Sequence, residues 1–370
     1  MIRFMILPPF LHAHRLRGVA LLLLILLAGC QAAGAQPPIV YLDWDAAGVV
    51  QLFRQDGANG TQLTQVADDV VDFAVAPDAR RIAFAVEEAA GSGIWLVGAN
   101  GRNLRQLLAC PAAACDRLVW APDGHRLVYE RRDHATPGVP RLWWLDVHSG
   151  ETLSVLQDAN AVSSGAGFAP DGAWLSYVAS PDEGIKLYNL VDGRFQTIPS
   201  EMGSPAVWSP RGAAFLLRNH QIFVLHGRDD DDHLAHSHDY SLSVYLYRAQ
   251  PGGDEIRRLS PEAEADDGAP AWSPDGEWIA FGRKKPRTAT GRQLWLMRAD
   301  GSEARPLTDD LLVHHGPPAW SPDGRYLLFQ RYPLTVSDAV PAIWLLELTT
   351  GELRQAAPRG MQPAWLSPAS

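Results

Sequence analysis

The heptapeptide PAWSPDG occurs at Pro270–Gly276 and again at Pro318–Gly324. Shorter forms of the same segment recur along the chain, each centred on one proline. The aligned prolines, separated by 45, 48, 40, 64, 48 and 46 residues, are Pro77, Pro122, Pro170, Pro210, Pro274, Pro322 and Pro368. A period of about 40–50 residues is typical of repeat proteins built from four-stranded units. The repeat therefore decides the fold.

Each repeat continues from its proline in the same way. The first six prolines are followed by an apolar segment such as EWIAFGR, a second one such as QLWLMRADG, and a short closing piece such as EARPLT. This pattern predicts four short strands per unit, and no helical periodicity of useful length occurs. In the segment RRIAFAV, residues 82, 84 and 86 are apolar, and so are the alternating residues 83 and 85. Two apolar faces predict a sheet packed between neighbouring sheets.

These features predict an all-β chain folded as a single β-propeller over residues 39–368. Six repeats are complete. The start of the chain, residues 39–64, resembles the later strands of a unit, and QPAWLSP near the end is a first strand with nothing after it. Pairing the N-terminal strands with the C-terminal strand would close the ring as a seventh blade and leave no free edge. We predict seven blades, with six as the alternative.

The segment WSPDGEWIAF followed by LWLMRADGSEARPLT resembles the WD40-like repeat of TolB-type propellers. The resemblance extends over residues 39–368 and implies a propeller that serves as a binding scaffold. Some repeats depart from the pattern, and the family is generally six-bladed. The departures are Ala79 in place of glycine, Arg211 in place of aspartate, and Val75 and Phe168 in place of tryptophan.

The repeated Ser-Pro-Asp-Gly segment has the chemistry of a tight turn. Proline presets φ, aspartate accepts hydrogen bonds from nearby backbone amides, and glycine adopts positive φ. We therefore interpret the recurrent aspartates as turn formers rather than ligands or catalytic acids. They are Asp78, Asp123, Asp171, Asp275 and Asp323.

The first 29 residues have the pattern of a secretory signal peptide. Arg15 and Arg17 precede a short apolar run that ends in Leu-Ala-Gly-Cys. This tetrapeptide resembles the bacterial lipobox, which implies that Cys30 is lipidated and that residues 30–38 form a tether. The alternatives are an ordinary signal peptide and an uncleaved membrane anchor. The expected location is extracytoplasmic, on the periplasmic or cell-surface side of a bacterial membrane.

Two further cysteines, Cys110 and Cys115, are the remaining pair in such a compartment. They predict a disulfide, with two free thiols as the alternative. Residues 1–29 hold three arginines and no acid, so removing them leaves 29 basic against 42 acidic residues, a formal charge of −13. This acidic balance argues against nucleic acid as a partner, and against binding to anionic lipid other than through the anchor.

The irregular loops are the candidate binding face, because loops on a rigid scaffold usually carry function. Motif turns occupy one end of a propeller, and the connections between blades occupy the other. The alternative is a set of merely solvated loops. The candidate residues are Asp68, Asp69, Asp266, Asp267, His314 and His315.

The longest repeat interval contains an insertion at about residues 226–243 with four consecutive aspartates and several histidines. Imidazoles with an adjacent carboxylate can bind zinc or a similar divalent ion. The candidate ligands are His233, His236, His238 and Asp239. The alternative, a flexible acidic loop, is favoured by repulsion among the aspartates.

No G-x-S-x-G, H-E-x-x-H or phosphate-loop motif occurs in the sequence. We therefore expect a monomeric, non-catalytic, membrane-anchored propeller that has no cofactor and binds a protein or a cell-envelope polymer through its loops. The first alternative is a propeller enzyme acting on glycans, whose scattered carboxylates would leave no local motif. The second is a metal-binding lipoprotein that uses the His/Asp loop.

Overall fold

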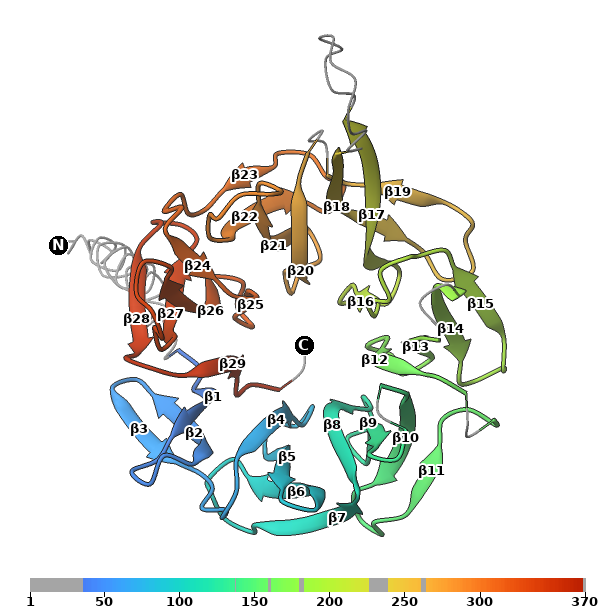
Figure 1. Ribbon diagram of the computed structural model, residues 1–370, viewed down its shortest axis with the longest axis vertical. Helices are drawn as coiled ribbons and strands as arrows, with labels where there is room; N and C mark the ends of the chain where they lie inside the picture. Colours follow the sequence, from blue (N-terminus) through green and yellow to red (C-terminus); the bar gives the residue numbers. More distant parts are fainter. Residues whose placement is uncertain are drawn as a thin grey trace, which may run out of the picture. The chain divides into compact units, whose positions relative to one another are not determined.

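In the computed structural model, short strands are grouped in twisted sheets around a common centre (Figure 1). The structure describes residues 36–136, 138–158, 161–179, 183–225, 239–260 and 264–368. Residues Pro37–Ser370 form one compact unit, and the architecture below is that of this unit. In the described residues, no helix is long and apolar enough to cross a membrane.

The first half of the chain contributes three four-stranded sheets and most of a fourth. The strands are β1 (Ile39–Trp44), β2 (Val50–Asp56), β3 (Asn59–Gln62), β4 (Val70–Val75), β5 (Arg81–Glu88), β6 (Gly91–Gly98), β7 (Arg105–Pro111), β8 (Ala113–Trp120), β9 (Arg126–Asp133), β10 (Pro140–Asp146), β11 (Thr152–Ser154), β12 (Ser164–Phe168), β13 (Trp174–Val178), β14 (Ile185–Asn189) and β15 (Phe195–Ile198). The sheets they form are β4–β7, β8–β11 and β12–β15, and β1–β3 belong to the fourth.

The second half continues the same alternation. Its strands are β16 (Val207–Trp208), β17 (Phe215–Leu225), β18 (Asp239–Ala249), β19 (Ile256–Arg258), β20 (Asp266–Trp272), β21 (Trp278–Lys284), β22 (Gln293–Arg298), β23 (Arg305–Pro306), β24 (Val313–His315), β25 (Ala319–Trp320), β26 (Tyr326–Pro333), β27 (Ala342–Glu347), β28 (Leu353–Ala357) and β29 (Met361–Trp365). Strands β24–β28 form one sheet, and β16–β23 form an eight-stranded one. The prediction of an all-β fold is confirmed.

The two ends of the described chain meet in one sheet. Strand β29 pairs antiparallel with β1, so that Trp365 lies opposite Ile39 and Ala364 opposite Val40. The sheet order is β29-β1-β2-β3, and Leu366 N donates to Pro38 O at 2.8 Å. The C-terminal strand thus supplies the first strand that the N-terminal segment lacks.

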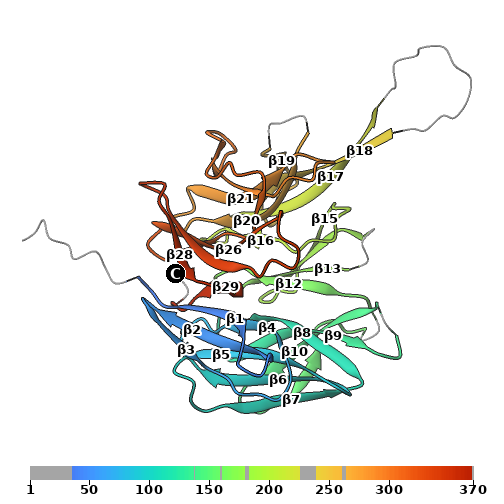
Figure 2. The same cartoon turned by 60° about the vertical axis from the view of Figure 1, so that its left-hand side comes forward.

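The eight-stranded sheet contains two repeat units. Strands β16–β19 belong to one and β20–β23 to the next, and the link between them is a single parallel pair, Val244 with Asp266. The β17–β18 hairpin is eleven residues long on each strand and extends farther outward than its neighbours (Figure 2). Its length reflects the insertion that widens this repeat.

Burial of both faces explains why the sheets stack. In β5, residues 82–86 are at most 3% exposed. Ile82 and Phe84 pack in a cluster with residues of β1 and β2, whereas Ala83 and Ala85 pack in a different cluster with residues of β8 and β9. A strand buried on both sides stabilises the fold only when both neighbouring sheets are present. The prediction of two-faced sheets is confirmed.

The motif tryptophans join neighbouring units by hydrogen bonds as well as by packing. Four of these indoles donate their N–H to a backbone carbonyl of the preceding inner strand at 3.0–3.1 Å. The pairs are Trp120 with Ala74, Trp272 with Val207, Trp320 with Ala271, and Trp365 with Ala319. In the fifth, Trp208 Nε1 donates to Ser176 Oγ at 3.3 Å. A buried indole N–H needs such a partner, so the tryptophan has a structural role in each of these five repeats.

The motif turns have the conformation that their chemistry predicts. Asp275 accepts hydrogen bonds from Ser273 Oγ and the Glu277 amide, and Gly276 has φ +74°. The same bond to the amide two residues on recurs at Asp78, Asp123, Asp171 and Asp323. Ala79, which replaces the glycine in the first copy, keeps a positive φ of +54°. These aspartates form turns.

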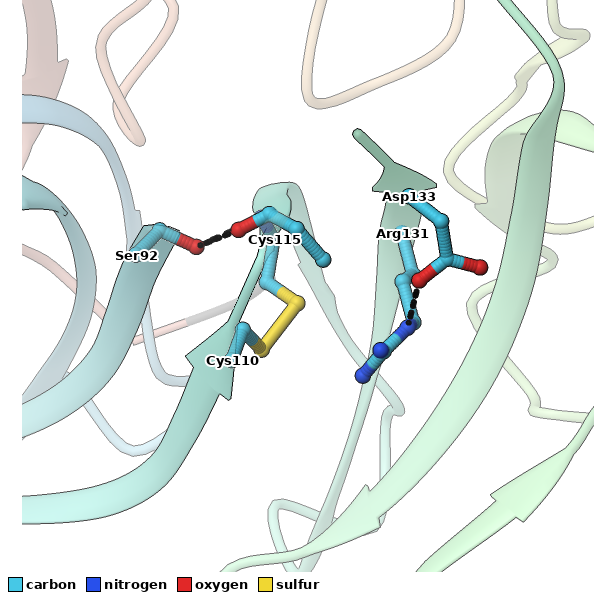
Figure 3. Close-up of a disulfide and its surroundings, with 6 residues drawn as sticks. Ser92, Cys110, Cys115, Arg131 and Asp133 are labelled. Carbon is cyan, nitrogen blue, oxygen red and sulfur yellow. Dashed lines mark hydrogen bonds and ion pairs between the residues drawn. A yellow bond between two sulfur atoms is a disulfide. The ribbon is translucent and has the colours of Figure 1, made fainter. Parts of the chain in front are cut away.

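Cys110 on β7 and Cys115 on β8 form a disulfide between adjacent sheets, with their Cα atoms 6.3 Å apart. Figure 3 shows the pair beside Ser92, whose Oγ accepts the Cys115 amide and donates to Ala113 O. Both cysteines are fully buried. The disulfide therefore fixes the short connection between β7 and β8.

Replacing both cysteines, as Cys110→Ser with Cys115→Ser, is expected to lower the free energy of unfolding by about 2 kcal/mol, because the link closes only a short loop in the unfolded chain. Urea denaturation with and without reductant measures this. The reductant should lower the midpoint of the wild type and leave that of the double variant unchanged. Equal midpoints for both proteins would contradict the prediction.

Candidate functional site

The inner strands of the sheets have two unlike ends. At the motif end, inner strands run into the Ser-Pro-Asp-Gly turns; at the loop end, the same strands begin. Asp266 starts β20, and the motif turn follows Trp272 at its other end. The strands closest to the centre in Figure 1 are β4, β8, β12, β16, β20, β25 and β29.

The inner strands share an irregularity between their loop-end and motif-end halves. Their pairing register shifts by a bulge, as between Asp116 and Val119 on β8 and between Gly268 and Ala271 on β20. One bulge residue with positive φ is Gly165 (+60°). Three others are not glycine: Arg117 (+52°), Ala269 (+48°) and Gln362 (+49°). Bulges re-aim side chains and are common beside functional sites, and positive φ is costly for residues other than glycine.

Asp267, predicted as part of the exposed binding face, is fully buried. Its carboxylate accepts Nε and Nη2 of Arg283 at 2.6 and 2.7 Å and Ser260 Oγ at 2.5 Å. Arg283 in turn lies over the Trp295 ring at 4.5 Å. This corrects the expectation: Asp267 faces the interior between two sheets and has a structural role.

Asp266 points to the opposite face of β20 and is partly exposed, with 23% of its side chain accessible. Its Oδ2 accepts Arg292 Nη2 at 3.0 Å and lies 3.7 Å from Lys284 Nζ. Arg292 also donates to the Asp266 carbonyl at 2.5 Å and to Gly282 O at 3.1 Å. Asp266 is thus the centre of a charged cluster at the loop end.

Two glycines make room for Arg292. Gly268 and Gly282 are cross-strand partners on β20 and β21. A Cβ on Gly282 would lie 2.4 Å from Arg292 Cδ, and a Cβ on Gly268 would lie 3.3 Å from Arg292 Nη1 and 3.2 Å from Arg218 Nη1. A glycine inside a strand weakens it and often marks a close approach. Here the pair lets the guanidinium of Arg292 extend across the sheet towards that of Arg218.

His314 and His315 lie on β24, next to the same cluster. The His315 side chain is fully buried, and its Nδ1 lies 3.1 Å from Arg292 O, which also accepts the His315 amide at 3.0 Å. Burial lowers the pKa of His315 to about 4, so the neutral ring donates from Nδ1 and fixes the backbone of Arg292. The ring of His314 stacks on Tyr332, and burial, followed by Arg292 and Lys284, lowers its pKa.

Because His315 is buried in its neutral form, the free energy of unfolding should decrease in acid. Its folded pKa of about 4 lies below the ordinary value of 6.5, so the unfolded chain binds the proton more readily. The contribution of His315 to the free energy of unfolding is fully present above about pH 6.5. It is lost as the pH drops towards 4, which lowers the free energy of unfolding by roughly 3 kcal/mol.

The measurement is urea denaturation at several pH values for the wild type and His315→Gln. The wild type should lose this extra stability in acid and the variant should not. His134→Asn, which replaces an exposed histidine, is the control and should follow the wild type. Parallel curves for His315→Gln and the wild type would contradict the assignment.

A second charged group lies on β8 and β9. Glu130 is 2% exposed and pairs with Arg132, which also pairs with Asp116. Nε of the bulge residue Arg117 is 3.6 Å from Glu130 Oε1. Asp72 on β4 accepts the Leu118 amide at 2.7 Å, and burial raises its pKa. Two carboxylates paired with arginine, Asp116 on β8 and Glu130 on β9, thus lie near a carboxyl on β4 whose pKa is raised.

The other predicted site residues lie elsewhere. Asp68 and Asp69 are exposed, and Asp69 Oδ1 accepts the Val50 amide at 2.7 Å. In the described part of the chain, no hydrogen bond or ion pair joins them to Asp266. The structure therefore brings Asp266, His314 and His315 together and leaves Asp68 and Asp69 outside that group.

Several predicted sites cannot be placed. Cys30, His233, His236 and His238 lie outside the described residues, and Asp239 is described only by its backbone as the first residue of β18. Within the described ranges, no group of three or more His, Cys, Asp or Glu residues could hold a metal ion. Lipidation and metal binding at these residues stay predictions.

Hollows at the motif end are lined by apolar residues and turn residues. One cavity of about 660 Å³ lies among inner strands and is lined by Trp120, Phe168, Trp365 and the motif prolines Pro77 and Pro122, among others. Its lining contains no charged side chain. The charged groups described above lie on the loop-end halves of the strands instead.

Comparison with known proteins supports the fold. No family model and no curated protein matches the sequence. Among solved structures, TolB from Acinetobacter baumannii is 16% identical with a TM-score of 0.54, covering 96% of this chain and 74% of TolB. The β-propeller domain of the Trilobed protease from Pyrococcus furiosus, which has an open velcro topology, is 14% identical with a TM-score of 0.57, covering 88% and 93%.

An enzyme is also among these neighbours. Oligogalacturonate lyase from Vibrio parahaemolyticus is 12% identical with a TM-score of 0.56, covering 87% of this chain and 86% of the lyase. At such identities the likeness concerns the fold alone. The predicted resemblance to TolB-like β-propellers is confirmed at that level.

Proposed function

We propose that the chain is a non-catalytic, extracytoplasmic propeller, lipid-anchored at Cys30, which binds a protein or a cell-envelope polymer at its loop end. The observation that carries this proposal is the contrast between the two ends. The motif-end aspartates are used in turns, whereas partly exposed Asp266, Arg292 and Lys284 gather at the loop end. A rigid ring whose loop-end charged groups are not used in turns suits binding of an extended partner.

We further propose that the ring has seven blades and is closed through β1 and β29. The pairing of these strands supports closure. The single parallel link at Val244 supports division of the eight-stranded sheet into two blades. Closure removes the free edges that would otherwise pair with other chains, which agrees with a monomer.

The experiment is chemical crosslinking of the full-length protein in its native envelope, followed by identification of what is captured. A reproducible protein or polymer partner that depends on loop-end residues supports the proposal. Capture that is unchanged by loop-end substitutions would contradict it.

A glycan-active enzyme is the second candidate, favoured by Asp72, whose pKa is raised, and by the neighbouring carboxylates of Glu130 and Asp116. A protonated acid and an ionised carboxylate are the pair that glycosidases use. Incubation with envelope polysaccharides tests this. Chain cleavage that is lost in Glu130→Gln and Asp72→Asn would favour the enzyme over the scaffold.

A metal-binding role for the His/Asp loop stays a proposal with a direct test. If His233, His236, His238 and Asp239 bind metal, the purified protein carries a stoichiometric divalent ion that disappears on deletion of residues 229–239. Metal-free wild-type protein after exposure to zinc would end this proposal.

A further inference from the structure

We propose that Arg218 and Arg292 form an oxyanion-binding site at the loop end, which takes a carboxylate or phosphate group of an acidic ligand. This inference rests on the proposed binding function and names the chemistry that the loop end recognises. The two guanidinium groups converge on Gly268, where an ideal Cβ would lie 3.2 Å from Nη1 of one and 3.3 Å from Nη1 of the other.

Arg292 is held in place before any ligand arrives. Asp266 fixes its guanidinium through Nη2, and the carbonyls of Asp266 and Gly282 accept from Nη1. His315 fixes its backbone. The side chain of Arg292 is 19% exposed, so its guanidinium is held in place and still reaches solvent. Preorganisation of this kind lowers the cost of binding.

Arg218 has a cationic neighbour, Arg292, in place of a carboxylate partner among the described residues. It lies on β17, and its Nη2 donates to Ser204 Oγ at 2.7 Å. Among the described residues, no carboxylate forms an ion pair with it. Burial lowers its pKa, the charge of Arg292 lowers it further, and Asp266 opposes both. A half-buried guanidinium held near another one is destabilising unless an anion compensates it.

The local charge is opposite to that of the whole chain. Arg292 and Lys284 pair with a single partly exposed carboxylate, Asp266, whose charge also acts on Arg218, while the full chain carries a formal net charge of −10. An arginine guanidinium binds the paired oxygens of a carboxylate or phosphate through its N–H donors, and among the described residues no acceptor is hydrogen-bonded to Arg292 Nε. An oxyanion between Arg218 and Arg292 would supply the missing counter-charge.

The cross-strand glycines add an independent argument. Gly268 and Gly282 face each other in the interior of paired strands, where side chains normally contribute packing. Structural needs alone favour β-branched or aromatic residues there. Because Gly268 has no side chain, the two guanidinium groups can approach each other, and a Cβ there would lie within 3.3 Å of both.

The test is calorimetric titration of the full-length protein, purified in a non-ionic detergent, with phosphate and separately with malonate at constant ionic strength. We expect saturable binding of at least one of them, weakened at least tenfold in Arg218→Gln. Gly268→Ala keeps both charges and places a methyl group within 3.3 Å of both guanidinium groups, so it should weaken binding similarly. The stronger of the two probes identifies phosphate or carboxylate as the ligand group.

Arg194→Gln removes an exposed arginine whose carboxylate partner is Asp192 and should leave the affinity unchanged. An equal loss of affinity in Arg194→Gln and Arg218→Gln would overturn the proposed site. So would the absence of saturable binding of both probes. Should Arg218→Gln fail to fold, Gly268→Ala decides alone. Saturable binding together with partner capture that Arg218→Gln does not alter would keep the oxyanion site and reject the proposed function at this end.

Discussion

Truncation after Gly360, which removes β29, is expected to abolish the cooperative fold rather than merely loosen one strand. Trp365 and Leu366 are both 8% exposed, and Trp365 donates its indole N–H to Ala319 O at 3.1 Å. Loss of one buried tryptophan side chain costs about 3–5 kcal/mol, and the truncation also removes the β1 pairing. Domains of this kind are stable by only about 5–15 kcal/mol.

The truncated protein should therefore lose its near-UV circular dichroism signal and its sharp urea transition. Truncation after Ser367 keeps β29 and is the matched control, which should unfold like the full chain. Retention of the wild-type midpoint after truncation at Gly360 would contradict the proposal that β1 and β29 close the ring.

Asp267→Ala is expected to lower the free energy of unfolding by about 3–5 kcal/mol, because it leaves the Arg283 guanidinium buried without its carboxylate. The side chains of Asp267 and Arg283 are 0% and 8% exposed. Urea denaturation at neutral pH measures the loss.

Two controls distinguish the lost pair from a general effect of mutation. Asp68→Ala removes an exposed aspartate and should change stability by less than about 0.5 kcal/mol. The double variant Asp267→Leu with Arg283→Met should recover much of the loss, since a buried ion pair can be replaced by apolar packing. A loss of less than about 1 kcal/mol in Asp267→Ala would contradict the structural assignment of this carboxylate.

The repeat made most of the fold predictable. The spacing of the motif prolines, the turn chemistry of Asp275 and Gly276, and the two apolar faces of the segment at 82–86 each predict a feature that the structure contains. The pairing of β1 with β29 was predictable because each terminus carries part of one repeat. The bonds from Trp120 and Trp272 to the preceding unit were not, because no local pattern encodes a contact to a residue 46 or 65 positions earlier.

The site was harder to predict. Asp266 and Asp267 were grouped because they are adjacent, although successive side chains in a strand point to opposite faces. The structure separates them into one partly exposed and one buried carboxylate. Alternation along β20 could have made that distinction.

Arg218 and Arg292 were missed because each is an isolated arginine in its stretch of sequence. They meet only because β17, which carries Arg218, contacts β20, and Arg292 directly precedes β22 in the same sheet. The available signal was indirect: Gly268 and Gly282 both interrupt apolar strands, and a glycine in such a place often marks a close approach. Only the register shows that the two are partners.

Site-specific photo-crosslinking in cells tests the central claim, that binding takes place at the loop end, most directly. A photoreactive residue is placed at position 284, where Lys284 is 35% exposed beside Asp266, and in a second protein at position 123, an exposed position in a motif turn. The account predicts a discrete adduct from position 284 and none from position 123. An adduct from position 123 alone, or the same adduct from both, would contradict it.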